Sequence, residues 1–188
     1  MKTTSQIKAL PIKLLALSFL LAFNFQTAKS QQLYSTREGR IQVTGMVKDK
    51  GVNAASSHLL AQINYNTAEI LLTLDPHLLL SKSDTLNMLL ASSVEPVILK
   101  GKLNIPYINT CKHPMQKLNF DGELFMNGIQ RLVSITGTLI HVADANPVAC
   151  ELSLKFNFIL SNFNVTDAPI NMADTVSVEI LQAILKRD

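Results

Sequence analysis

Residues 150–160 alternate between apolar and polar side chains, and this period of two restricts the fold more than any other feature of the chain. In the stretch CELSLKFNFIL every even-numbered residue is apolar, and the odd-numbered residues from Glu151 to Asn157 are polar. Successive side chains of a strand point to opposite faces of its sheet, so the pattern predicts a half-buried antiparallel strand. The chain therefore has to bury one face of a β-sheet.

The dipeptide Asn127-Gly128 predicts a tight hairpin, because a type I′ turn needs positive φ at both central positions and this pair tolerates it. A two-residue loop also fixes the register. Met126 then lies opposite Ile129 and, further along, Leu118 lies opposite Gly137, so that the apolar faces of the two strands coincide. A slip of one residue would send every side chain to the opposite face, and the agreement therefore supports the pairing.

Asn66-Thr67 predicts a second hairpin by the same test. Tyr65 then faces Ala68, and the register continues until Leu59 faces Leu74, again with the apolar faces together. Both hairpins are antiparallel and connect neighbouring strands.

Three further stretches alternate in the same way, at Arg40–Lys48, Glu95–Leu103 and Thr175–Leu185, the last with Ile184 on its inward face. The total is eight strands. Eight mostly sequential antiparallel strands, polar outside and apolar inside, close into a barrel whose interior holds side chains or one small ligand. A two-sheet sandwich is the alternative all-β architecture.

One segment has the period of a helix instead. Residues Asp84–Ser92 place Leu86, Leu89 and Leu90 in one apolar stripe, and Asp84 is expected to cap the first turn. We therefore expect a single short helix beside the barrel.

Residues 1–30 have the layout of a secretory signal peptide: a Lys-bearing start, an apolar run over Leu14–Phe23, and small residues at Ala28 and Ser30. The alternative is a membrane anchor, but about ten apolar residues at ~1.5 Å each fall short of the ~30 Å hydrocarbon core. We expect a signal peptide over residues 1–30 and one domain over residues 31–188, exported to the periplasm or secreted, with no stable membrane anchor.

The charge of the chain gives no support to nucleic acid binding. Its 17 basic and 14 acidic residues suggest a basic protein, but four of the lysines lie within residues 1–30, where no acid occurs. The remaining 13 basic groups face 14 acidic groups, so the domain itself is close to neutral.

Three stretches carry a resemblance to a known family. Residues 120–133 (FDGELFMNGIQRLV) are similar to the central hairpin of the YceI-like exported bacterial proteins, residues 161–165 (SNFNV) to the turn after its long strand, and residues 174–180 (DTVSVEI) to its closing strand. The resemblance extends over roughly residues 39–185. It implies an extended lipocalin-like barrel and an apolar partner of the isoprenoid lipid class. The matching positions are turn and packing positions, so the resemblance assigns no ligand contact.

The two cysteines are expected to form a disulfide. Cys111 precedes one strand and Cys150 begins another, and in an up-and-down meander both lie at the same barrel end. Export favours the oxidised form. His113 and His141 gather at that end too, which leaves a Cys₂His₂ zinc site and two buried thiols as alternatives. We expect no metal.

Nothing in the sequence indicates catalysis. No G-x-S-x-G elbow, phosphate-binding loop, dinucleotide fingerprint or HExxH is present, and we expect no enzyme activity and no cofactor. His58 and His77, which have no Cys or acid at useful spacing, are expected at the surface. Arg131 lies in the inward register near a hairpin end, either as a rim residue or as a contact to a ligand head group.

The inward faces of the strands supply the candidate site. They are aliphatic or Phe throughout, which fits either a core filled by side chains or a pocket for one long apolar ligand. Together with the family resemblance, they favour an exported, non-catalytic binding protein for a polyisoprenoid or isoprenoid quinone-like lipid; the alternative is a structural or interaction module with a filled barrel in the cell envelope. The pocket candidates are Leu59, Ile63, Ile70, Leu72, Phe120, Leu124, Val133, Ile135, Leu154, Phe156, Phe158, Val178 and Ile180.

Overall fold

The structure is a computed structural model that describes residues 32–93, 95–108, 114–142, 149–165 and 171–187. The predicted signal peptide lies outside these residues. No helix within them is long and apolar enough to cross a lipid bilayer. The elements, in chain order, are β1 (Leu33–Val47), β2 (Lys50–Asn64), β3 (Glu69–Leu74), the 3₁₀ turn η1 (Pro76–Leu78), β4 (Leu80–Ser81), α2 (Asp84–Ser92), β5 (Val97–Lys102), β6 (Gln116–Met126), β7 (Ile129–Val142), β8 (Ala149–Ile159), the 3₁₀ turn η2 (Leu160–Phe163) and β9 (Thr175–Arg187).

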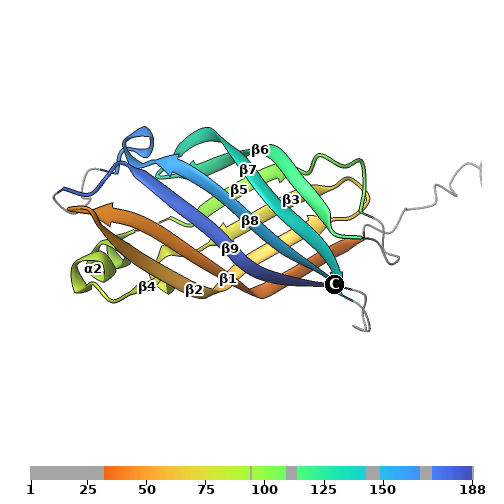
Figure 1. Cartoon of the computed structure of the whole chain (residues 1–188), viewed down its shortest axis with the longest axis horizontal. Coiled ribbons are helices and arrows are strands. Elements are labelled where there is room, and N and C mark those ends of the chain that lie inside the picture. Colours follow the sequence, from red (N-terminus) through yellow and green to blue (C-terminus); the bar gives the residue numbers. More distant parts are fainter. Residues whose placement is uncertain (1–31, 94, 109–113, 143–148, 166–170, 188) are drawn as a thin grey trace, which may run out of the picture. The chain divides into compact units, whose positions relative to one another are not determined.

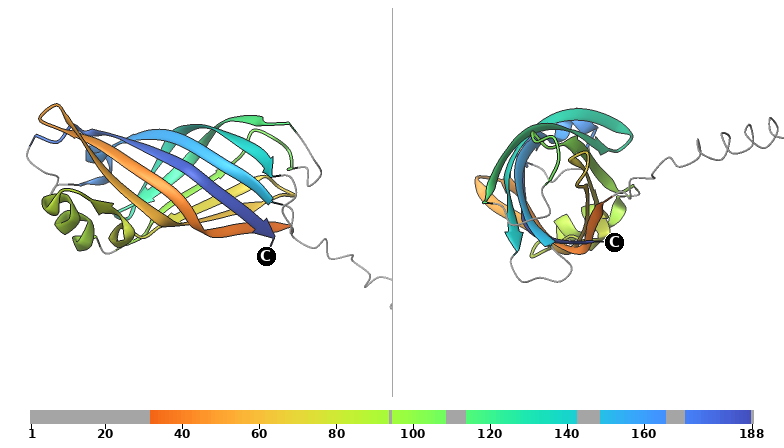
Figure 2. Two further views of the ribbon diagram at one scale, coloured as in Figure 1. Left: turned by 60° about the horizontal axis from the view of Figure 1, so that its bottom comes forward. Right: turned by 90° about the vertical axis from the view of Figure 1, so that its right-hand side faces the viewer.

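Eight of the described strands close into a barrel. Their order around the sheet is β1-β9-β8-β7-β6-β5-β3-β2, and a further pairing of β1 with β2 completes the circle. Every ladder is antiparallel, and β4 only adds two residues beside β2. The expected eight-stranded antiparallel barrel with one short helix is confirmed (Figures 1 and 2), and the continuous ladder excludes the two-sheet sandwich.

The Asn127-Gly128 hairpin has the predicted geometry. Asn127 and Gly128 have φ of 51° and 70°, as a type I′ turn requires. β6 and β7 pair from Met126 opposite Ile129 to Leu118 opposite Gly137 without a break. The turn chemistry therefore sets the register of the longest uninterrupted ladder among the described strands.

The β2–β3 hairpin has the predicted register but a different turn. Asn64 pairs with Glu69, so the connection contains four residues and the expected two-residue turn is wrong. The positive φ falls on Ala68, at 58°, and the Ala68 N–H donates to the Asn64 carbonyl at 2.8 Å. The loop is longer than predicted by one residue on each strand, so the register does not change and Ile63 still pairs with Ile70.

An irregularity between β8 and β9 corrects the predicted inward face of β9. Leu154 pairs with Ile180, but Leu152 pairs with Ala183, so β9 has an extra residue in this interval. The extra residue exchanges the two faces of the strand. Ala183 and Leu185 are fully buried, whereas Ile184, expected to point inward, is 39% exposed.

One end of the barrel is packed shut. At this closed end, where β2 turns into β3, the Tyr34 and Tyr65 rings stack with their centroids 3.8 Å apart. The segment after β5 folds across them: the Leu103 N–H donates to the Ala68 carbonyl at 2.9 Å, and the Ile108 N–H donates to the Tyr65 carbonyl at 2.8 Å. The opposite end, which carries α2, η2 and the Asn127-Gly128 turn, is called the open end below (Figure 1).

Candidate ligand-binding cavity

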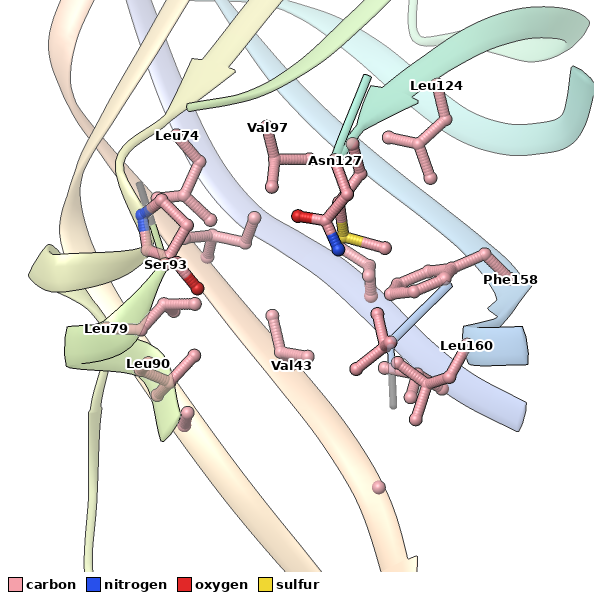
Figure 3. A pocket seen from close by; sticks show the side chains of 18 of the residues that line it. Val43, Leu74, Leu79, Leu90, Ser93, Val97, Leu124, Asn127, Phe158 and Leu160 are labelled. Carbon is pink, nitrogen blue, oxygen red and sulfur yellow. The ribbon is translucent and has the colours of Figure 1, made fainter. Parts of the chain in front are cut away.

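A cavity of about 560 Å³ occupies the half of the barrel next to the open end. Its walls come from α2, from η2 and from the inward faces of the strands, and they are mostly aliphatic or Phe (Figure 3). A pocket of this size is within the 300–1,000 Å³ range that is usual for small-molecule sites. The barrel is therefore neither wholly filled nor wholly hollow.

Helix α2 lies over the mouth of this cavity and turns its apolar stripe toward it. Leu86, Leu89 and Leu90 all line the cavity, and none of them is fully buried. The helix has the predicted bounds, but its cap is Ser83, whose hydroxyl accepts from the Leu86 N–H at 3.4 Å. Asp84 lies instead in the first turn, so the prediction of Asp84 as the cap is wrong.

The thirteen candidate residues divide between the two halves of the barrel. Both groups are inward-facing, as the strand periodicity predicted. Seven of them line the cavity: Leu59, Leu72, Leu124, Phe156, Phe158, Val178 and Ile180. The other six lie in the packed core outside the cavity: Ile63, Ile70, Phe120, Val133, Ile135 and Leu154.

The boundary between the halves is built on two glycines. Gly101 and Gly122 lie directly opposite each other on β5 and β6. A Cβ on Gly101 would stand 2.9 Å from Cε2 of Phe120, and a Cβ on Gly122 would stand 2.7 Å from Cδ1 of Ile135. The missing side chains thus leave the space that the Phe120 ring and Ile135 occupy. We call Phe120 and Ile135 the plug.

Several cavity residues were not among the sequence candidates. Val43, Val52 and Ala54 line the wall on β1 and β2, and Met172 reaches over Gly45. The first half of β2 reads GVNAASSH and carries no apolar alternation, so its inward face could not be read from the sequence. Val43 belongs to the alternating stretch Arg40–Lys48, but it was not among the pocket candidates predicted from the sequence.

Polar groups are confined to the rim of the cavity. Ser93 follows α2 on one side, and Asn127 lies on the other (Figure 3). Glu95 and Asn164 also line the cavity. The Asn127 amide Nδ2 donates to the Phe163 carbonyl at 3.2 Å, which fixes that side chain at the mouth. None of the described residues that line the cavity is basic, and Glu95 is the one charged residue among them.

Arg131 is not part of the cavity wall. Its side chain is exposed, and its guanidinium Nη1 donates to the carbonyl of the neighbouring Gln130 at 3.0 Å. Arg131 therefore lies on the outer surface, outside the residues that line the cavity.

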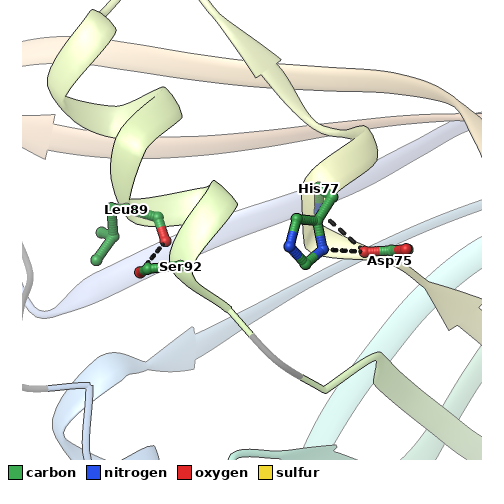
Figure 4. A network of polar contacts seen from close by, with 4 residues as sticks. All are labelled: Asp75, His77, Leu89 and Ser92. Carbon is green, nitrogen blue, oxygen red and sulfur yellow. Dashed lines mark hydrogen bonds and ion pairs between the residues drawn. The ribbon is translucent and has the colours of Figure 1, made fainter.

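The histidines of the open half are on the outer surface. His58 is exposed, as predicted. His77 is exposed too, but it does have an acidic neighbour: its Nδ1 lies 2.8 Å from Oδ1 of Asp75, which also accepts from the His77 backbone N–H (Figure 4). These hydrogen bonds lower the pKa of Asp75. The pair caps η1 where it leads into the segment before α2, and the expectation that His77 has no acid at useful spacing is wrong.

Cys150 is the second residue of β8, at the closed end, and is fully buried. It pairs across the ladder with His141, and burial raises the pKa of its thiol. The Tyr65 phenol lies beside it, and burial together with this neighbour raises the pKa of Tyr65. Cys111 and His113 lie outside the described residues. Within the described ranges no three His, Cys, Asp or Glu side chains form a group that could hold a metal ion.

The disulfide between Cys111 and Cys150 stays a prediction. Peptide mapping of the exported protein without reducing agent is expected to recover the two cysteines in one linked pair. The Ser substitution of either cysteine should remove that pair and expose one thiol to alkylation after unfolding. Stoichiometric zinc together with two alkylatable thiols in the unmodified protein would contradict the disulfide.

The same fold occurs in solved structures of other proteins. A polyisoprenoid-binding domain from Saccharophagus degradans, implicated in plant cell wall breakdown, matches with a TM-score of 0.65 and 7% identity over 84% of this chain and 99% of that one. BcnA of Burkholderia cenocepacia matches with a TM-score of 0.57 and 14% identity over 78% and 95%. No family model and no curated protein matches the sequence. The fold implied by the YceI-like resemblance is confirmed.

Proposed function

We propose that this chain is a non-catalytic binding protein of the YceI-like type, which takes one apolar isoprenoid-type lipid into the open half of its barrel. The cavity carries this proposal: its volume is about 560 Å³, and most of the side chains that bound it are apolar. Burial of an apolar chain there is favourable by up to ~0.8 kcal/mol per CH₂ group. The fold shared with a polyisoprenoid-binding domain supports the same ligand class.

The rim favours a neutral head group. A phosphate at the mouth would meet Glu95 and find no basic partner among the described lining residues. A quinone or hydroxyl oxygen, in contrast, needs only donors such as the Ser93 hydroxyl. We therefore expect isoprenoid quinones or prenols to bind more tightly than the corresponding prenyl phosphates.

Thermal unfolding of the delipidated protein tests the proposal. At a hundredfold excess over its Kd, a ligand that binds only the folded state is expected to raise Tm by roughly 5–10 °C. A prenol and its phosphate, compared at equal concentration, also test the head-group preference. Mass spectrometry of lipid extracted from the purified protein would identify what is bound in the cell.

Two substitutions on α2 provide a matched pair. Leu90→Lys places an ammonium group at the cavity mouth and is expected to abolish the Tm shift. Met88→Lys changes the other side of the same helix, where Met88 is 76% exposed, and should keep it. If no prenol or quinone raises Tm, the structural or interaction module becomes the better account of the barrel.

We further propose that the protein is exported after removal of residues 1–30. The charge asymmetry and the Ala28-Lys29-Ser30 sequence support this proposal. Sequencing of the mature N-terminus should begin at or near Gln31, whereas Met1 in exported material would contradict it.

A further inference from the structure

The cavity does not run the length of the barrel, and the point at which it stops is defined by particular side chains. On β3, Leu72 lines the cavity and Ile70, two residues away on the same face, does not. On β8 the same change occurs between Phe156 and Leu154. β3 and β8 are separated by three strands in the barrel order, and on both of them the cavity ends within one inward-facing position.

The residues beyond this end of the cavity are tightly packed. Ile135 is fully buried and Phe120 is 7% exposed. Both occupy the space that side chains on Gly101 and Gly122 would otherwise take. Beyond them, the stacked rings of Tyr34 and Tyr65 occupy the closed end. A ligand that enters at the open end meets the plug before it reaches the closed end.

The volume of the cavity limits how much chain fits above the plug. An engineered protein cavity of about 150 Å³ holds benzene, which corresponds to roughly 25 Å³ per carbon. By that measure, 560 Å³ holds about 20 carbons. An isoprene unit has five carbons, so the space is filled by about four units.

We propose that the barrel limits how much of a prenyl chain it encloses, with the plug of Phe120 and Ile135 as the stop that restricts the enclosed tail to about four isoprene units. This inference rests on the proposed function, and it specifies the ligand further. A longer prenyl chain leaves its additional units outside the mouth, in water or against another surface, where they contribute nothing to affinity.

A series of prenyl alcohols measures the limit directly. Geraniol, farnesol, geranylgeraniol and octaprenol have two, three, four and eight isoprene units and the same head group. With the delipidated protein, affinity from displacement of a fluorescent fatty acid is expected to rise about tenfold per unit up to four units. Octaprenol should then bind no more tightly than geranylgeraniol.

Two substitutions should move the limit in opposite directions. Phe120→Ala removes a phenyl group from the plug and opens space for about six carbons, so an alcohol of five units should gain affinity over one of four. Ala54→Phe adds a phenyl group to the cavity wall and should lower the limit to about three units. Leu139→Ala is the control, because Leu139 is fully buried at the closed end and away from the cavity; it should leave the limit at four units.

The outcomes separate the two proposals. A limit that moves up with Phe120→Ala and down with Ala54→Phe supports the chain-length stop. If Phe120→Ala does not fold, Phe120→Leu and the downward shift in Ala54→Phe still test it. Affinity that continues to rise from four to eight units in the unmodified protein overturns the stop while leaving lipid binding intact. Binding of none of the alcohols overturns the proposed function, and the stop with it.

Discussion

Gly137→Ala is expected to lower the free energy of unfolding by about 3 kcal/mol or more. Gly137 lies on β7, opposite Leu154 of β8. A Cβ there would stand 2.2 Å from the Ser153 carbonyl oxygen and 2.6 Å from Cδ2 of Leu154. The carbonyl oxygen is backbone and cannot rotate away, so β8 has to shift and its ladder with β7 has to deform.

Gly51→Ala is the matched control for that substitution. Gly51 lies on β2 and is exposed, and the nearest atom to a Cβ at this position is Sδ of Met46, at an ordinary contact distance of 4.0 Å. The Gly51→Ala variant should differ from the unmodified protein by less than about 0.5 kcal/mol in its free energy of unfolding. Urea unfolding of both variants gives the comparison, and equal losses would show that the close approach of β7 and β8 at Gly137 does not exist in solution.

Ile135→Ala and Phe156→Ala are expected to differ in cost although the two residues face each other across β7 and β8. Ile135 is fully buried in the plug, and its truncation should cost about 4 kcal/mol, because the transfer and cavity terms add. Phe156 has one side toward the cavity, so fewer contacts are lost and about 2 kcal/mol is expected in delipidated protein. Phe156→Ala should in turn weaken prenol binding.

The order of these two costs is the decisive observation. Urea unfolding of delipidated protein measures both. Phe158→Trp, on the cavity wall, adds the opposite test, since a hollow site accepts extra volume at a small cost in stability and loses binding. If Phe156→Ala costs the 3–5 kcal/mol of a filled core and no ligand raises Tm, the binding proposal should be abandoned.

The strand pattern was readable from the sequence wherever turn chemistry and alternation agreed. Asn127-Gly128 set both the turn and the register, because few pairs tolerate two positive φ angles. At the β2–β3 connection the register followed from the apolar faces, but the turn did not, since Ala68 gives no sign in the sequence that it takes a positive φ. The irregularity that buries Ala183 in place of Ile184 depends on how β8 and β9 coil together, which a local pattern does not record.

The division of the barrel into a hollow and a filled half was not readable from the sequence. The inward residues of both halves are of the same types: Phe156 borders the cavity and Phe120 fills the plug. What distinguishes them is the pair Gly101 and Gly122, whose missing side chains admit the Phe120 ring, and that pairing is visible only once β5 and β6 lie side by side. Alternation identifies which residues point inward, whereas contacts across the barrel decide whether those residues fill the interior or border a cavity.

The closure of the barrel by β1 and β9 has a consequence for how the chain folds. Most other neighbours in the barrel follow each other along the sequence, and β3 and β5 are separated only by η1, β4 and α2. β9, in contrast, has to return from the far end of the chain to reach β1. Until it does, β1 and β8 each present an unpaired edge. We therefore expect closure to be the slow, late step of folding, and a nascent or truncated chain that ends before Thr175 to carry two edges open to association with other chains.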